Sequence, residues 1–194
     1  DEENSQFRGS VTAGSFDRRI ADVHLMQRWG DHTLSLAARQ DSGELDNDAR
    51  DGNAAFSDNY YSDRRLWGAF ANSRFGGRYG SEHQHRATDL RWNWRNVALY
   101  AQHFELRTGY GNAYAGDTVQ NQAVWREPDS AYGASITHAT GAWKGTSLLR
   151  YRQSGVADDS YFVEGYDVVQ ADGSRRRVVD FSYWGSQNNS LAFS

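Results

Sequence analysis

The sequence contains no cysteine and a single proline, Pro128. The absence of cysteine excludes a disulfide framework and every site that depends on a thiolate. The near absence of proline allows long uninterrupted β-strands, and 19 glycines provide many positions for turns between them. We therefore expect a chain rich in strands and turns.

Long apolar segments are also absent. A membrane-spanning helix needs about 20 mainly apolar residues in a row, and no segment of the 194 residues meets this requirement. Mean hydropathy is low, at -0.83, yet aromatic residues make up 14% of the chain. Disordered chains are poor in aromatic residues, so we expect a folded protein.

Lysine is nearly absent, because Lys144 is the only lysine among 21 Lys and Arg residues. With 25 Asp and Glu the net charge is -4, which gives no generally basic surface and argues against nucleic acid as a partner. Residues 1–7, DEENSQF, have neither the basic nor the apolar region of a signal peptide. We expect any such peptide to have been removed or to lie outside this sequence.

The sequence does contain repeated alternation of polar and apolar residues. In residues 88–96, TDLRWNWRN, every second position from Leu90 to Trp94 is apolar and the positions between are polar. Successive side chains of a strand point to opposite faces, so this segment predicts a strand with one apolar and one polar face. A less strict alternation predicts further strands, and we expect about nine in all. They include residues 19–28, 32–39, 131–139, 146–154 and 177–184.

The connections between these strands alternate between short and long. Short turns are expected at residues 29–31, 95–96, 141–145 and 185–189, and long loops at residues 41–86, 108–130 and 155–175. Consecutive antiparallel strands turn at opposite ends, so the short turns lie at one edge and the long loops at the other. Transmembrane β-barrels have this arrangement, with short periplasmic turns and long extracellular loops.

We therefore predict an all-β fold in which residues 1–194 form part of one antiparallel transmembrane β-barrel. The apolar faces would contact lipid and the polar faces a lumen, and the tracts of about 9 to 11 residues have the length needed to cross a bilayer at a tilt. A short helix is expected within residues 62–77. Four tryptophans beside the short turns would form an aromatic girdle: Trp29, Trp94, Trp143 and Trp184.

Residues 7–48 resemble the first barrel strands of TonB-dependent outer-membrane receptors. The matching motifs are Gly14-Ser15-Phe16, Arg18-Arg19, Gly30-Asp31 and Asp41-Ser42-Gly43, and residues 147–168 resemble a mid-barrel strand and loop of the same family. The resemblance implies a 22-stranded barrel with a plug domain and an inner-membrane energy-coupling protein as partners. It also implies uptake of a scarce small-molecule ligand, such as a metal chelate, across the bacterial outer membrane.

The chain has room for about nine strands, shows no plug, and ends without the terminal aromatic residue typical of outer-membrane barrels. We interpret it as the N-terminal part of a larger barrel that contacts outer-membrane lipid and lipopolysaccharide. Two alternatives stay open: a small passive outer-membrane channel or adhesin, and a soluble β-sandwich that binds carbohydrate.

Candidate ligand-binding residues are the aromatic side chains of the expected long loops. Tyr and Trp give large, rigid contact surfaces with a polar tip, and in receptors of the resembled family such loops capture the ligand. Packing of the loops against one another is the alternative. The candidates are Phe56, Tyr60, Tyr61, Trp67, Tyr110, Tyr114 and Trp125.

Three other clusters of polar residues are less specific candidates for binding sites. His83 and His85 would share a strand face and could bind a transition metal, or they could simply form a polar loop end. Acidic residues at 44–48 and 157–160 could bind Ca²⁺, and residues 175–177, a run of three arginines, could meet lipopolysaccharide phosphates, but both also suit a solvated surface. No nucleophile elbow or dinucleotide motif occurs. We therefore expect neither an enzyme nor a cofactor.

Overall fold

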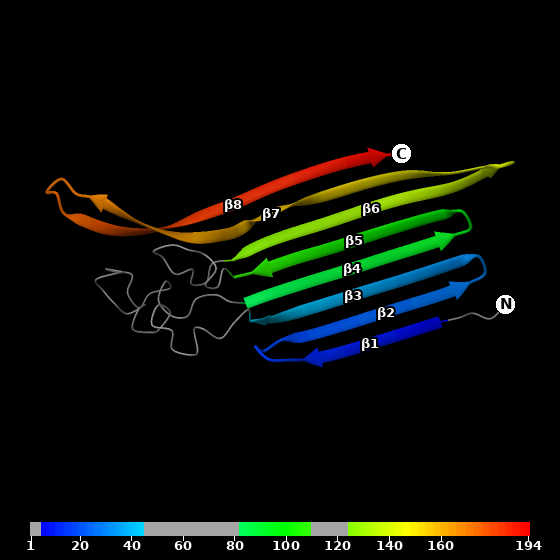
Figure 1. Ribbon diagram of the computed structural model, residues 1–194, viewed down its shortest axis with the longest axis horizontal. Helices are drawn as coiled ribbons and strands as arrows, with labels where there is room; N and C mark the ends of the chain where they lie inside the picture. The colour runs from blue at the N-terminus through cyan, green and yellow to red at the C-terminus, as the bar shows by residue number, and fades with distance from the viewer. Residues whose placement is uncertain (1–4, 45–81, 110–123) are drawn as a thin grey trace.

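The computed structural model describes residues 5–44, 82–109 and 124–194. These residues form a single antiparallel sheet in which eight strands follow one another in chain order (Figure 1). The strands are β1 (Ser5–Ala13), β2 (Arg19–Trp29), β3 (His32–Glu44), β4 (Glu82–Trp94), β5 (Val97–Thr108), β6 (Trp125–Thr140), β7 (Trp143–Val169) and β8 (Arg175–Phe193).

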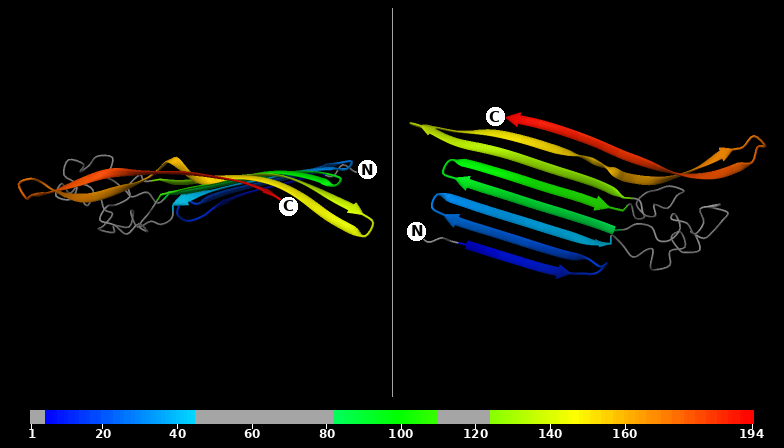
Figure 2. Two further views of the ribbon diagram at one scale, coloured as in Figure 1. Left: turned by 90° about the horizontal axis from the view of Figure 1, so that it is seen from above. Right: turned by 180° about the vertical axis from the view of Figure 1, so that it is seen from behind.

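The sheet is a single twisted layer, as the two views of Figure 2 show. β1 and β8 are its two edges and do not pair with each other, so the described strands form an open sheet. No helix occurs among the residues that the structure describes. The prediction of an all-β antiparallel fold is confirmed, whereas a closed barrel is not seen.

Three two-residue turns lie at one end of the sheet, on the right in Figure 1. They join β2 to β3, β4 to β5 and β6 to β7. The first turn residues are Gly30 (φ 52°), Arg95 (φ 51°) and Gly141 (φ 60°), and a positive φ at this position is what a type II′ hairpin requires. The predicted grouping of these short turns at one edge is confirmed.

The opposite end carries the connections from β1 to β2, β3 to β4, β5 to β6 and β7 to β8 (Figure 1). Strands take up part of the segments expected to be loops here, because β3 continues to Glu44 and β6 already begins at Trp125. The rest of the two central connections lies outside the described residues, as does the helix expected within residues 62–77. We call this end the long-loop end and the other the short-turn end.

The last third of the chain differs from the prediction. Residues 155–175 are not a long loop: β7 continues to Val169, and a turn at residues 170–174 leads into β8, with the amide of Gln170 donating to the carbonyl of Ser174 at 2.7 Å. The short turn expected at residues 185–189 is wrong as well, because these residues lie inside β8. The described sheet therefore has eight strands and not nine.

The reason for this error is a close approach between β7 and β8. A Cβ atom on Gly155 would overlap the carbonyl oxygen of Ser186, so the glycine allows the two backbones to come together. The ladder shifts here, since Val156 pairs with Ser186 but Ser160 pairs with Trp184. Glycine and polar residues that resemble turn signals in the sequence therefore mark a β-bulge.

The register of the sheet brings a band of apolar residues from all eight strands to one face, although other apolar side chains, such as Met26, Phe104 and Leu148, lie on the opposite face. One row of directly opposed residues illustrates this: Phe7, Leu25, Leu36, Leu90, Ala101, Tyr132, Tyr151 and Leu191. We call this face the belt face and its apolar band the belt. The opposite face is the groove face.

The described structure has almost no hydrophobic core. Only Ala131 and Phe162 are buried apolar residues within it, whereas Phe7 is 70% and Leu149 is 48% exposed. A soluble domain buries most residues of this kind. The belt therefore has no protein layer over it in the described part of the chain.

Candidate functional site

The belt face lacks charge through the middle of every strand. Over at least seven successive residues of each strand, this face carries no Asp, Glu, Lys or Arg. These uncharged stretches are residues 5–13, 21–29, 32–42, 88–94, 97–103, 128–140, 143–155 and 181–193. The charged residues of the same stretches all lie on the groove face.

The belt crosses the first four strands obliquely. Its apolar residues span Ala21 to Leu25 on β2 but Leu90 to Trp94 on β4, and Leu25 is in line with Leu90 through their common partner Leu36. The belt thus moves toward the short-turn end as the sheet is crossed. Strands that tilt in a bilayer need such an oblique band, because lipid depth is measured along the membrane normal and not along the strand.

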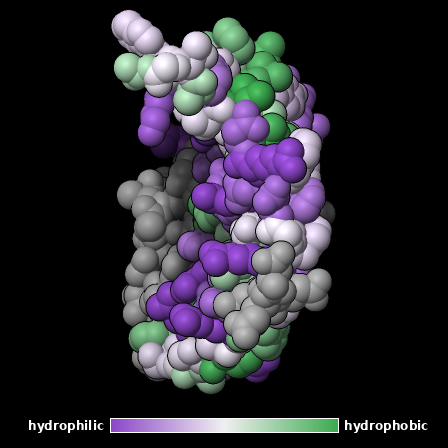
Figure 3. Space-filling view, turned by 90° about the vertical axis from the view of Figure 1, so that its right-hand side faces the viewer, coloured by the Kyte–Doolittle hydropathy of each residue, from purple (hydrophilic) through white to green (hydrophobic). Residues whose placement is uncertain are grey.

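An aromatic cluster closes the belt at the short-turn end. The ring of His32 stacks on Trp29 and Trp94, with centroids 5.4 Å and 5.9 Å away, and also on Trp92 at 5.6 Å. Trp143 lies at the same end and is 83% exposed. Figure 3, which looks at this end of the molecule, shows hydrophilic residues across its middle and hydrophobic residues at its upper right and bottom. Three of the four tryptophans predicted for a girdle are therefore at the expected edge.

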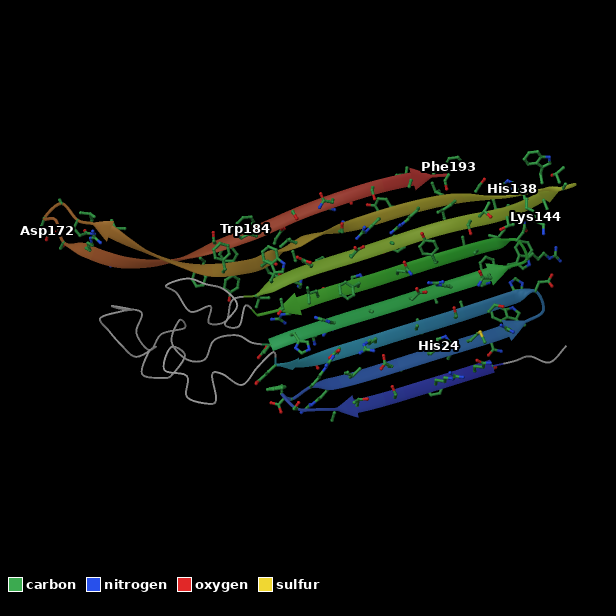
Figure 4. The ribbon with its side chains drawn as sticks, in the orientation of Figure 1. His24, His138, Lys144, Asp172, Trp184 and Phe193 are labelled. Carbon is green, nitrogen blue, oxygen red and sulfur yellow. The ribbon has the colours of Figure 1, made fainter. Side chains whose placement is uncertain are left out.

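Trp184 is the exception. It pairs with Ser160 near the long-loop end, and Figure 4 shows it far from the labelled His138 and Lys144 at the short-turn end. Its ring lies 6.0 Å from that of Phe162. Its assignment to the short-turn girdle was wrong because the turn expected at residues 185–189 does not exist.

The groove face carries a groove of about 1120 Å³ lined by residues from β1 through β7. Its charged lining residues are Arg8, Asp22, Arg39, Asp89, Asp129, Arg150 and Arg152.

Ion pairs order the charges of the groove face. Arg91 makes a bidentate contact with Asp89, at 2.7 Å and 2.9 Å, and Gln102 donates to the same carboxylate at 2.6 Å. Nε of Arg152 lies 3.0 Å from Oδ2 of Asp129. Each of these carboxylates has a guanidinium partner, as charges facing a restricted polar space need.

Arginine is in excess on this face. Asp22 is paired with Arg39 at 3.4 Å, whereas Arg8 and Arg150 form no ion pair with the described residues. Over the same stretches the groove face carries seven basic residues, Arg8, Arg28, Arg39, Arg91, Lys144, Arg150 and Arg152, against four aspartates, Asp22, Asp41, Asp89 and Asp129. Its field favours anionic over cationic solutes.

A second ionic cluster lies at the long-loop end of the groove face. Arg18, from the turn between β1 and β2, contacts Asp41 with Nε at 3.1 Å and Nη2 at 2.8 Å. Arg39 is 3.5 Å from the same carboxylate, whose side chain is 7% exposed. Asp41 lies three residues beyond Ala38, where the belt ends on β3. Hydrogen bonding from Arg18 holds the pKa of Asp41 well below its usual range.

The two candidate histidine ligands are close together at this end. His83 and His85 share the groove face of β4, as expected, and their ring centroids are 5.4 Å apart. Nε2 of His83 lies 3.6 Å from Oδ1 of Asp41, and His83 Nδ1 is buried without a hydrogen-bond partner. Within the described residues no group of three or more His, Asp or Glu side chains is arranged to hold a metal ion.

Most of the aromatic ligand-binding candidates lie outside the described residues. These are Phe56, Tyr60, Tyr61, Trp67, Tyr110 and Tyr114. Trp125 begins β6 at the long-loop end, where its indole Nε1 donates to Glu127 Oε1. The amide of Arg126 bonds to Ser160 Oγ at 3.0 Å, and this contact brings Trp125 to the same end of the groove face as Phe162 and Trp184.

Phe162 and Trp184 are candidates that the sequence interpretation missed. Their position follows from the bulge in the ladder between β7 and β8, and no local motif signals it. The acidic segment at residues 157–160 belongs to the same bulge. There Asp159 pairs with Arg126 at 3.1 Å and Ser160 is fully buried, so these residues serve the sheet. Arg175 and Arg176 are exposed at the start of β8.

Comparisons with known proteins add no assignment, because no family model, curated protein or solved structure matches the chain. In the described ranges, no helix has the length and apolar character needed to span a membrane.

Proposed function

We propose that this chain forms part of the wall of a bacterial outer-membrane β-barrel that takes up a scarce nutrient, in the manner of the TonB-dependent receptors that its sequence resembles. One observation carries the proposal: the uncharged belt crosses one face of all eight strands, while the charges of the same stretches lie on the other face.

Lipid accounts for this one-sided exclusion of charge. An Arg or Lys facing lipid at the bilayer midplane costs about 2–4 kcal/mol, whereas lumen-facing charge is tolerated. A soluble sandwich would cover the belt with a second sheet, and the described residues provide no such layer.

The proposed wall must close. The outer backbone groups of β1 and β8 have no ladder partner in the described sheet, and each unpaired group in hydrocarbon costs several kcal/mol. In the proposed receptor, further strands pair with both edges, and a plug domain fills the lumen. This chain supplies wall and loops, and an inner-membrane energy-coupling protein drives the plug.

The groove face indicates the class of ligand. Its excess of arginine favours an anion, and Trp125, Phe162 and Trp184 provide aromatic surface at the end from which a ligand would enter. We propose an anionic metal chelate with planar groups as the transported nutrient. A small passive channel is the second candidate, because eight strands in up-and-down order is the strand count of the smallest outer-membrane barrels.

Adjacent leucines on β7 provide the test of the wall. The chain contains no cysteine, so the variants Leu148→Cys and Leu149→Cys each carry one fluorophore at a defined site. In bilayers that contain nitroxide-labelled lipid, we expect strong quenching at position 149 and weak quenching at position 148. Leu36→Cys and Ala37→Cys repeat the comparison on β3. Equal quenching within both pairs would disprove the lipid-facing belt.

The transport proposal needs its own experiment. Cells that depend on the full-length gene product should take up an anionic iron chelate, and this uptake should stop when the inner membrane is de-energised. Uptake that continues without energy would favour the passive channel. The quenching result would be the same for a receptor and for a passive channel. The quenching experiment therefore tests the lipid-facing wall, and the uptake experiment tests the transport mechanism.

A further inference from the structure

A tyrosine ring lies over a glycine in the middle of the groove face. Tyr100 on β5 is the ladder partner of Gly133 on β6. A Cβ atom on Gly133 would come within 2.1 Å of Cε1, 2.2 Å of Cζ and 2.5 Å of Oη of Tyr100. A glycine inside a strand often marks such a close approach. Here the missing side chain lets the ring extend from β5 across the backbone of β6.

Arg150 on β7 is next in the same row. It is the other ladder partner of Gly133, so the phenol of Tyr100 extends toward it. Arg150 is exposed and lines the groove. Asp129 attracts it electrostatically, but the carboxylate of Asp129 bonds to Arg152. The guanidinium of Arg150 therefore forms no ion pair with the described residues.

The guanidinium on the opposite side of the ring is already engaged. Arg91 on β4 is the second ladder partner of Tyr100, and it contacts Asp89 at 2.7 Å and 2.9 Å. Of the two arginines that flank the ring, Arg150 is thus the one open to a ligand. We call Tyr100, Gly133 and Arg150 the platform.

The platform lies at the depth of the belt. Leu99 and Leu149, which precede Tyr100 and Arg150 in sequence, lie in the belt on the other face of the sheet. The aromatic residues proposed to meet the ligand first lie farther out, at the long-loop end. A nutrient that enters from that end would reach the platform later, inside the proposed lumen.

Resting on the proposed function, we propose that the platform is a second binding site for the transported nutrient and takes a planar aromatic carboxylate group. The aromatic ring of the ligand stacks on Tyr100 in an offset arrangement. Its carboxylate accepts two parallel hydrogen bonds from the guanidinium of Arg150. The nutrient class is thereby narrowed to chelates that bear aromatic carboxylates.

Binding of two dicarboxylates to the full-length gene product in bilayers tests the platform. Isophthalate is planar and aromatic, whereas its hydrogenated cyclohexane analogue carries the same charge without a flat ring. A fluorophore on Leu148→Cys, on the groove face two residues from Arg150, reports the binding of either probe. We expect isophthalate to bind about 2–10-fold more tightly, the range that aromatic stacking supplies.

Variants of the platform should separate the two contacts. Tyr100→Leu should remove the preference for isophthalate, and Gly133→Ala should do the same because its methyl group displaces the ring. Arg150→Gln should weaken both probes about ten-fold or more, since each loses hydrogen bonds from a charged group. Arg28→Gln is the matched control, an exposed arginine of the groove face at the short-turn end, and should leave both affinities unchanged.

Equal binding of the two probes to the unmodified protein, or no binding of either, would overturn the proposal. An Arg150→Gln variant that loses no more affinity than Arg28→Gln would also overturn it. Failure of the proposed function would appear in other measurements. The wall would fail through equal quenching at positions 148 and 149, and driven transport through uptake that continues without energy.

Discussion

Leu148 and Leu149 are neighbours in sequence that face opposite sides of the sheet: Leu148 lies opposite Ser135 on the groove face, and Leu149 lies opposite Ala134 in the belt. The two side chains are chemically identical and at the same level of β7. Any difference in their response to substitution therefore reports the environment of the two faces.

Arginine at these two positions should have unequal effects. We expect Leu149→Arg to reduce the free energy of unfolding in bilayers by about 2–4 kcal/mol, because the charge would face lipid. Leu148→Arg should cost much less, since arginines already occupy that face. Denaturant titration of both variants in the same lipid measures the difference, and equal losses would indicate a packed soluble core on both sides.

The two ends of the sheet should lie on opposite sides of the outer membrane. In intact cells, an impermeant thiol reagent should label Asp172→Cys in the turn between β7 and β8, but not Asn96→Cys or Trp143→Cys at the short-turn end. Permeabilised cells provide the control, in which all three should react. Labelling of Asn96→Cys in intact cells at the rate of Asp172→Cys would contradict the orientation.

The Arg18–Asp41 contact predicts a dependence of stability on pH. The pKa of Asp41 is lower in the folded protein than in the unfolded chain, so its stabilising contribution is complete above the unfolded value of about 3.9. It is lost as the pH falls through the lower, folded value. The difference in melting temperature between the unmodified chain and Asp41→Asn should therefore shrink only below about pH 4.

Arg18→Gln gives the check on that interpretation. If the guanidinium of Arg18 lowers the pKa of Asp41, the two single variants and the double variant should lose about the same amount of stability. The difference in melting temperature between each variant and the unmodified chain should shrink in acid. Additive losses for Arg18→Gln and Asp41→Asn would show that the two side chains act independently.

Gly155 tests the part of the fold that the sequence interpretation got wrong. Gly155→Ala should destabilise the protein by about 1–3 kcal/mol, because the added methyl group meets the backbone of Ser186. Gly14→Ala is the control, since its nearest neighbour, Cβ of Arg18, is 3.8 Å away. If the two variants unfold alike in denaturant, residues 185–189 do not pair with β7 as described.

Sequence alone predicted the features that depend on local pattern. Alternation in residues 88–96 identified both faces of β4, and Gly30 and Gly141 marked two of the turns because a positive φ favours glycine. The course of β7 and β8 was missed, since Gly155 and residues 185–189 acquire their role only from each other across the ladder. Likewise, the position of Tyr100 over Gly133 depends on register, which no single strand encodes.

The oblique course of the belt means that partners in the hydrogen-bond ladder do not share a depth in the bilayer. The belt is centred near Gly9 on β1 but near Trp92 on β4, and the ladder aligns Gly9 with Thr88, closer to the long-loop end. These strands thus present their lipid-facing bands at different levels. Further strands that complete the barrel must be staggered by the same offset, so that the lipid-facing bands of its first and last strands lie at the same depth in the membrane.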